Sequence, residues 1–216
     1  MSESDDGDIK CYFHDKLRPL AYVNTMWPSE DTLDILVSMV AGLWIYAATL
    51  VRFIMDHEDL PRQQLDCVLE FHSQQIQLDT KSSVTAELDA FYGMIISWIS
   101  SKHLPIAQQS FLIHHTASET TLHILCNIQG LALEDLKHTV SKLYSVLTFI
   151  PEEERFWGEP FPGSTYISFY HASFMEFLLD KTRSGEYCLK DQCHHIALAL
   201  KVLCLFKDLY GMNGIS

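Results

Sequence analysis

The sequence predicts a mainly α-helical protein that contains one small β-hairpin. Apolar residues make up 48% of the 216 residues, which suits a globular protein with a buried core. Over most of the chain these residues recur every three or four positions, as on one face of a helix. Only residues 146–150 and 165–169 are short β-prone runs, and a turn-rich insert separates them. We therefore expect helices on both sides of a single hairpin.

The first part of the chain predicts three helices. Residues 5–18 have helical apolar spacing. Ser29 can cap a second helix, because its hydroxyl oxygen can accept from the amides of the first turn. That helix is expected to run to about Asp56, with a bend or break at Gly42. Pro61 begins the next helix, since proline is favoured in a first turn.

The middle of the chain predicts a loop and then three further helices. The polar residues 79–83 form the expected loop, and helix resumes near Ala86. Pro105 begins the following helix. A short one covers residues 120–128, and Gly130 ends it, in keeping with the preference for glycine after a helix.

The last predicted elements indicate a winged-helix-like unit. A strongly amphipathic helix is expected from Leu133 to about Leu147, and the two β-prone runs follow it. Helix returns over residues 172–179. Three helices, a hairpin and a further helix together indicate a winged-helix-like domain at about 104–180.

These elements define three predicted regions. Residues 1–103 form a helical segment, residues 104–180 the winged-helix-like domain, and residues 181–216 a C-terminal helical segment. A helix from Gln192 to Leu209 dominates the last region.

The charge and hydropathy of the sequence limit which binding partners and which cellular location we expect. The formal net charge of −13 argues against nucleic acid and against anionic membrane surfaces as partners. Residues 35–51 are uncharged but short for a membrane span and follow two aspartates, so a buried helix is the better interpretation. The acidic N-terminus does not resemble a signal peptide, and we expect a cytoplasmic protein.

Glycine and cysteine patterns exclude two further classes. None of the nine glycines is followed by lysine, so the sequence carries no Walker A phosphate-binding loop. The six cysteines lie apart in apolar segments without a C-x-x-C pair, which favours free, buried thiols over a disulfide framework. These cysteines are Cys11, Cys67, Cys126, Cys188, Cys193 and Cys204.

Other reactive side chains give weak signals. Cys188, Cys193, His194 and His195 lack the second ligand pair of a structural zinc site, so no metal is predicted. His114 and His115 are adjacent on a helix and should face different directions. Residues 152–154 are glutamates in a polar insert, where a solvated loop is expected. Without a G-x-S-x-G turn, hydrolase chemistry is disfavoured.

The most distinctive segment is residues 169–178 (FYHASFMEFL), where a predicted strand ends and a helix begins. Helical spacing puts Phe174, Phe177 and Leu178 on one buried face. Taken alone, the pattern favours a core helix with His171 near its N-terminus over a ligand site.

The same segment resembles the F-x-H-x-S-F-x-E-F signature in the winged-helix domain of NACHT-type signalling NTPases, which belong to the NLR-like STAND class. Residues 41–54 (AGLWIYAATLVRFI) resemble the G-L-F-I-Y-A-A-T-x-x-R-F-I motif of the large fungal branch of that class. Shorter matches in the same order lie at residues 8–17, 27–28, 88–95, 143–147 and 180–184.

The resemblance implies a helical lid followed by a winged helix. His171 would contact the β-phosphate of bound ADP and hold a closed state, as an imidazole at a helix N-terminus can do. Gly42 and Leu43 would border the adenine. Many relatives have proline two residues after this glycine, whereas this chain has Trp44.

In the family, a P-loop core precedes the lid and a repeat domain follows the winged helix. We therefore expect this chain to be a fragment or a truncated paralogue without catalysis. It would bind no cofactor alone, and ADP or ATP only with a complete core. Its partner would be its own or a related NACHT core, with homo-oligomerisation possible. A contact surface around Trp44, Ile45 and Tyr46 is expected to be exposed.

Three other functions remain open from the sequence. A stand-alone chain could act as an interaction decoy that pairs with full-length relatives. A winged-helix DNA binder is less favoured, because Lys137 and Lys142 are balanced by Glu134 and Asp135 on the helix that would enter the groove. An enzyme of another type is the least favoured.

Overall fold

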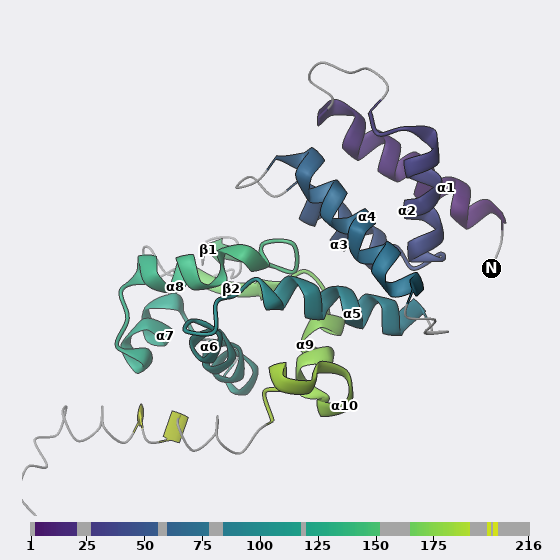
Figure 1. Ribbon diagram of the computed structural model, residues 1–216. Helices are drawn as coiled ribbons and strands as arrows, with labels where there is room; N and C mark the ends of the chain where they lie inside the picture. The colour runs from purple at the N-terminus through teal and green to yellow at the C-terminus, as the bar shows by residue number, and fades with distance from the viewer. Residues whose placement is uncertain are drawn as a thin grey trace, which may run out of the picture. The chain divides into compact units, whose positions relative to one another are not determined.

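The computed structural model describes residues 3–20, 27–55, 60–77, 84–117, 120–151, 165–190, 198–199 and 201–202 (Figure 1). Within these residues it contains ten α-helices, short 3-10 turns and one two-stranded antiparallel sheet. The expectation of a mainly α-helical fold with a single small hairpin is confirmed. No helix among these residues is long and apolar enough to cross a membrane.

The chain divides into two compact units. The first, called the N-terminal unit, comprises residues 1–91 and Tyr144–Val146. The second, called the C-terminal unit, comprises Tyr92–Leu143 and the residues from Leu147 onwards. The division therefore falls inside one helix, α5 (Val84–Ser97), between Phe91 and Tyr92.

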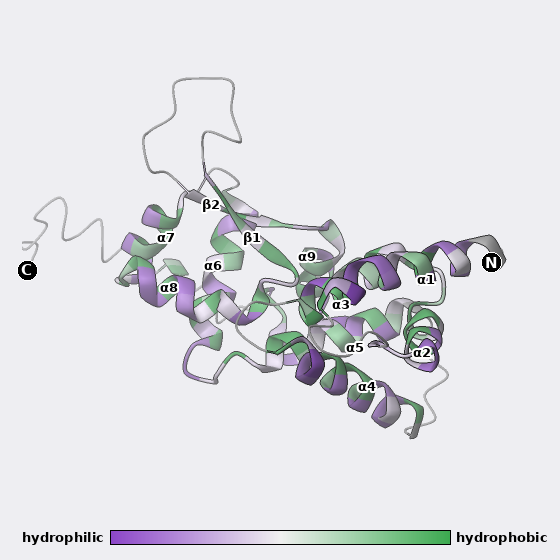
Figure 2. Ribbon diagram, turned by 90° about the horizontal axis from the view of Figure 1, so that it is seen from above, coloured by the Kyte–Doolittle hydropathy of each residue, from purple (hydrophilic) through white to green (hydrophobic). Residues whose placement is uncertain are grey.

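Four helices and the first half of α5 build the N-terminal unit. They are α1 (Glu3–Leu17), α2 (Glu30–Val40), α3 (Trp44–Ile54) and α4 (Pro61–Gln77), and a 3-10 turn, Arg18–Leu20, follows α1. Helix α4 alternates hydrophilic and hydrophobic residues along its length (Figure 2), as expected of a helix with one face in a core. The fully buried side chains of the unit include Ile9, Phe13, Leu17, Leu36, Val40, Tyr46, Ala47, Leu50, Ile54, Val68 and Phe91.

The predicted helix after Ser29 is broken near Gly42. Ser29 caps α2 as expected, since its Oγ accepts from the backbone N–H of Thr32 at 3.2 Å. The helix ends where Ala41 and Gly42 take positive φ angles of 42° and 83°. Helix α3 then starts at Trp44, so the uncharged stretch 35–51 is divided between two helices.

An aromatic cluster lies in the core of the N-terminal unit. The ring centroid of Phe91 is 5.5 Å from that of Tyr46, 5.4 Å from Phe53 and 5.9 Å from Phe71. Pairs of rings at such spacings add to the stabilisation that burial alone provides. Phe91 thereby joins α5 to α3 and α4.

The C-terminal unit is built from three helices, a β-hairpin and further short helices. It contains α6 (Leu104–Thr116), α7 (Leu122–Gln129) and α8 (Leu133–Val140), followed by β1 (Leu147–Pro151) and β2 (Thr165–Phe169). The strands pair from Leu147↔Phe169 to Pro151↔Thr165, and an isolated bridge joins Thr121 to Tyr166. After β2 come α9 (Ala172–Leu179), the single turn α10 (Lys181–Ser184) and a 3-10 turn, Gly185–Tyr187.

Helix α6 is the buried centre of this unit and carries three consecutive polar residues. Gln108 donates to the backbone carbonyl of Glu186 at 3.1 Å, and Gln109 accepts from Lys201 at 2.6 Å. Ser110 Oγ accepts from the amide of Gln129 on α7 at 2.6 Å. Buried polar groups need such partners, so this triplet ties three separate segments to α6.

The helix predicted from Leu133 to about Leu147 is too long. Helix α8 ends at Val140, a 3-10 turn covers Ser141–Leu143, and Leu147 begins β1. The Ser141 hydroxyl donates to the backbone carbonyl of His138, which offers the last turn an alternative to helical pairing. The β-prone residues after it instead pair with β2, a long-range contact that helical periodicity cannot reveal.

Of the remaining predicted elements, the short helix before Gly130 is described by the structure and three others are not. Gly130, whose φ is 67°, ends the short helix α7 as expected, and Thr121, rather than a residue before 120, is its N-cap. The predicted loop 79–83, the insert between the strands and most of the helix 192–209 lie outside the described residues.

The cysteine prediction is partly wrong. Cys126 and Cys188 are free and buried, but Cys11 and Cys67 are free and exposed. Cys11 lies on α1 and Cys67 on α4, at exposed helical positions where single side chains of this size need no partner. Cys193 and Cys204 lie outside the described residues.

The predicted exposed surface at the start of α3 is also only partly present. Trp44 is 46% exposed, but Tyr46 is buried at 1% because it contributes to the Phe91 cluster. The indole of Trp44 also contacts Tyr12 of α1, with ring centroids 5.7 Å apart.

Candidate functional site

His171 lies in the C-terminal unit, between the end of β2 and the start of α9. Its backbone is extended and it is the N-cap residue of α9. The ring nitrogen Nδ1 accepts a hydrogen bond from the backbone N–H of Ser173 at 3.0 Å. The imidazole is exposed, so the histidine takes the capping position that serine, threonine or aspartate usually holds and still reaches solvent.

A chain of hydroxyl groups leads from His171 into the core. Ser173 Oγ lies 2.8 Å from His171 Nδ1, and 2.8 Å from the hydroxyl oxygen of Tyr92 on α5. Because Nδ1 accepts from a backbone N–H, it carries no hydrogen of its own in the neutral ring. The hydrogen of neutral His171 is therefore on Nε2.

Aromatic side chains of α9 pack against the ring of Tyr92 and hold its hydroxyl group beside Ser173. Phe174 and Phe177 are each 1% exposed and contact the ring of Tyr92, at centroid distances of 5.1 Å and 5.7 Å. The predicted buried face of this helix is thus confirmed, with Leu178 as its third member. Phe111 of α6 and Phe169 of β2 also pack against Phe174.

This arrangement suits recognition of an anion. The Nε2–H group is a donor at the N-terminus of a helix, where the aligned peptide dipoles favour negative charge. Nδ1 is already used as an acceptor, so His171 is not positioned to take a proton from a neighbouring nucleophile.

Gly42 and Leu43, the residues predicted to border adenine, lie in the turn between α2 and α3 of the N-terminal unit. The backbone N–H of Leu43 donates to the carbonyl of Val40 at 2.8 Å, and the Leu43 carbonyl accepts from Tyr46 and Ala47. The positive φ of Gly42 is a conformation that favours glycine. The turn is half-buried.

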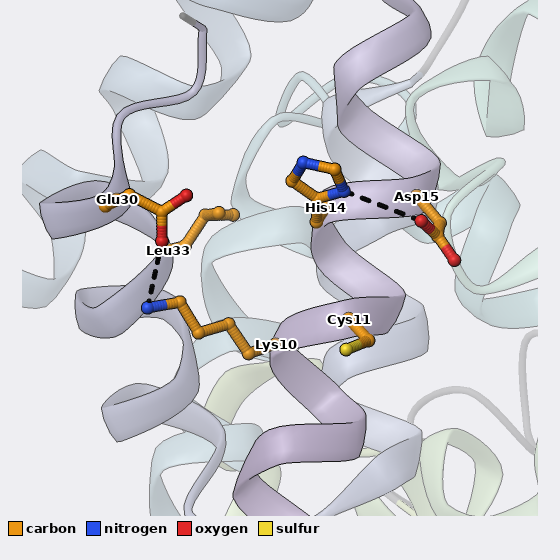
Figure 3. A pocket seen from close by; sticks show the side chains of 6 residues that line it. All are labelled: Lys10, Cys11, His14, Asp15, Glu30 and Leu33. Carbon is orange, nitrogen blue, oxygen red and sulfur yellow. Dashed lines mark hydrogen bonds and ion pairs between the residues drawn. The ribbon is translucent and has the colours of Figure 1, made fainter.

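The N-terminal unit also contains a small pocket between α1 and α2 (Figure 3). Its volume is about 290 Å³, at the lower limit for small-molecule sites. Lys10 extends from α1 towards α2, where its ammonium group is 3.1 Å from Glu30 and 2.5 Å from Asp34. Two side-chain hydrogen bonds raise the pKa of Lys10, and the bond to Asp34 has a larger effect than the bond to Glu30. The pocket is lined by Lys10, Cys11, His14, Asp15, Glu30 and Leu33.

Cys11, His14 and Asp15 resemble the residue types of a nucleophilic site, but their geometry does not support one. The Nε2 atom of His14 is 2.7 Å from the guanidinium of Arg18, which can only donate. Nδ1 then carries the hydrogen and faces Asp15 at 3.5 Å. With both nitrogens engaged, His14 has no free lone pair with which to activate the thiol of Cys11.

The other candidate residues do not form a metal site in the part of the chain that the structure describes. Among those residues no three His, Cys, Asp or Glu side chains converge. Cys188 is buried, while Cys193, His194, His195 and glutamates 152–154 lie outside the described ranges. His114 is half-buried against Phe169 and His115 is exposed, so the adjacent pair does face different ways.

The charges on α8 oppose binding to phosphate groups along DNA. Lys137 lies 3.4 Å from Glu134 on the same helix. The helix therefore presents paired charges rather than the clustered cations that duplex binding needs.

The sequence motif identifies His171, but it does not identify Tyr92, which is linked to His171 through Ser173. Tyr92 and Ser173, whose hydroxyl groups are in contact, are 81 positions apart in the sequence. The apolar stripe of α5 marks Tyr92 only as a core residue, and no local pattern reports the direction of its hydroxyl group.

Comparison of the chain with protein-family models, curated proteins and solved structures gave no match. A functional assignment therefore depends on the residues and their geometry.

Proposed function

We propose that this chain is a non-catalytic regulatory and interaction module of a NACHT-type signalling NTPase. In this role it binds a P-loop ATPase core, its own or a related one, and couples the nucleotide state of that core to domain opening. One observation carries the proposal: exposed His171 caps α9 through Nδ1, which leaves the hydrogen of the neutral imidazole on Nε2. That donor would contact the β-phosphate of ADP.

The element order gives further support. In the N-terminal unit the Gly42–Leu43 turn separates α2 from α3, and the resemblance of residues 41–54 to the family's motif implies that this turn is part of a lid. The C-terminal unit follows with a winged-helix order. We assign Gly42 and Leu43 to the border of the adenine, with Trp44 in the position where many relatives carry proline.

The nucleotide core must come from outside these 216 residues, because their sequence contains no Walker A motif. The chain alone would bind neither ADP nor ATP tightly. We assign it to the cytoplasm, where ADP and ATP are available to such a core.

An interaction decoy is the second candidate. The exposed indole of Trp44 favours it, since aromatic residues are enriched at protein interfaces. A decoy would pair with full-length relatives whatever nucleotide they hold, whereas the regulatory module responds to ADP. The dependence of binding on ADP therefore separates the two.

The test measures affinity between this chain and the purified P-loop core of a NACHT-type relative, with and without ADP. We expect ADP to strengthen the complex. His171→Asn should weaken the ADP complex roughly tenfold or more, the value of a hydrogen bond to a charged group. Asparagine is a good N-cap, so this variant keeps the start of α9 and removes only the Nε2 donor.

The matched control is His123→Asn, which changes another exposed histidine of the C-terminal unit, on α7. It should leave the affinity unchanged. Equal affinity with and without ADP, or an ADP complex that is insensitive to His171→Asn, would contradict the proposal.

A further inference from the structure

Two consecutive residues of α5 belong to two different cores. Phe91 packs among Tyr46, Phe53 and Phe71 in the N-terminal unit. Tyr92 packs against Phe174 and Phe177 in the C-terminal unit, and its hydroxyl group reaches Ser173. Tyr92 therefore brings a polar group of α5 to Ser173, near the start of α9.

We propose that Tyr92 is a positioning residue through which α5 controls the hydrogen-bond state of His171. The control acts through the Ser173 hydroxyl, which lies 2.8 Å from both the Tyr92 hydroxyl oxygen and His171 Nδ1. This inference rests on the proposed function, because it concerns the regulation of the same histidine.

The direction of these hydrogen bonds follows from one donor, the backbone N–H of Ser173. The backbone N–H of Ser173 donates to Nδ1, so Nδ1 cannot donate to the Ser173 hydroxyl. The Ser173 hydroxyl therefore donates towards Nδ1 and accepts from Tyr92. Hydrogen bonds that run in one direction polarise one another, so the Tyr92 hydroxyl strengthens the bond at His171.

The consequence is a link between α5 and the proposed phosphate contact. When α5 is packed on α9, the imidazole is fixed with its hydrogen on Nε2. When α5 moves away from α9, Ser173 loses its donor and the ring is held less firmly. Linkage is reciprocal, so a phosphate bound at Nε2 must in turn favour α5 packed on α9.

The test uses the full chain without nucleotide and follows the ring-nitrogen NMR signals of His171. Tyr92→Phe keeps the ring that packs on Phe174 and removes the hydroxyl. We expect it to move the Nδ1 signal towards that of a weaker acceptor. Ser173→Ala removes the intermediate hydroxyl and should move the signal further, while the backbone N–H still supports the cap.

Tyr46→Phe is the matched control, because Tyr46 is as deeply buried as Tyr92, at 1% exposure, but lies in the N-terminal unit. It should leave the His171 signals in place. An unchanged Nδ1 signal in Tyr92→Phe overturns the inference, as does an equal change in Tyr46→Phe. If Tyr92→Phe does not fold, an unchanged signal in Ser173→Ala overturns it equally.

A second readout separates this inference from the proposed function. In the ADP-dependent complex with a P-loop core, Tyr92→Phe should lower affinity by roughly two- to tenfold, less than His171→Asn does. If the NMR signal moves but no variant changes ADP-dependent binding, the control of His171 by Tyr92 is supported and the proposed phosphate contact is contradicted. If ADP-dependent binding requires His171 but Tyr92→Phe leaves the His171 signals unchanged, only the proposed control by Tyr92 is contradicted.

Discussion

The two ring nitrogens of His171 have different tasks. Nδ1 completes the N-cap of α9, which is a structural task, and Nε2 carries the hydrogen of the neutral, exposed ring. Substitutions can separate the tasks because several small polar side chains replace the cap, while none of them supplies a donor at the position of Nε2.

The cap predicts different stabilities for two variants of His171. His171→Ala leaves the N–H of Ser173 without its side-chain acceptor and should lower the free energy of unfolding by about 1 kcal/mol. His171→Asn can accept the same hydrogen bond and should cost much less. Urea denaturation measures both. Equal losses would mean that the imidazole stabilises α9 by packing rather than by capping.

His72 on α4 predicts a dependence of stability on pH. Burial lowers the pKa of this histidine, and the nearby carboxylate of Glu87 only partly opposes the effect. The unfolded chain therefore binds the proton more readily than the folded one. Stability is full above the ordinary histidine pKa of about 6.5 and falls as the pH drops through the lowered, folded-state value.

The variant His72→Gln tests this origin. It removes the titrating group and should flatten the change of the unfolding midpoint between about pH 7 and pH 5. His123→Gln, on exposed α7, serves as the control and should retain the wild-type slope. If the slope persists in His72→Gln, other groups cause it.

At the scale of elements, the turn between α2 and α3 holds a residue in an unfavourable conformation. Ala41 has a φ of 42°, in the left-handed region that glycine adopts without steric cost. Ala41→Gly should therefore raise the free energy of unfolding by about 0.5–1 kcal/mol. Gly42→Ala, at a φ of 83°, should lower it by a similar or larger amount.

Thermal denaturation of both variants gives the measurement. Gly93→Ala is a useful comparison, since Gly93 lies inside α5, where an added Cβ meets no atom within 4 Å. Helix propensity alone should make that variant more stable. Destabilisation by Ala41→Gly would show that the turn does not keep its left-handed conformation in solution.

Local signals account for most of the helices and for the hairpin. Helix α9 runs from Ala172 to Leu179 as its apolar spacing predicts, and Ser29 and Gly130 mark helix ends as expected. The end of α8 was not predictable in this way, because the pairing of Leu147 with Phe169 removes residues that could continue the helix.

The candidate site was predictable only in part. The motif around His171 identifies the histidine and the buried face of its helix. The hydroxyl of Tyr92 and the ion pair of Lys10 with Glu30 depend on which helices pack together. Such contacts join distant positions, and a single sequence carries no periodic signal for them.

At the scale of the whole molecule, one helix contributes to two cores. Phe91 and Tyr92 are adjacent in α5, yet their rings pack in different units. Adjacent helical positions point about 100° apart, which lets a single helix present an apolar side chain to each core. This arrangement predicts that the units differ in local stability while sharing α5.

Hydrogen exchange of two core variants tests that prediction. Phe13 of α1 and Phe177 of α9 are each at most 1% exposed, and their replacement by alanine should cost about 3–5 kcal/mol. Exchange of backbone amides reports local opening, so Phe13→Ala should accelerate it in α1 to α4 and Phe177→Ala in α6 to α9. Amides of α5 should respond to both variants, since each core holds part of that helix. Uniform acceleration across all helices in either variant would instead show that the chain opens as one cooperative unit.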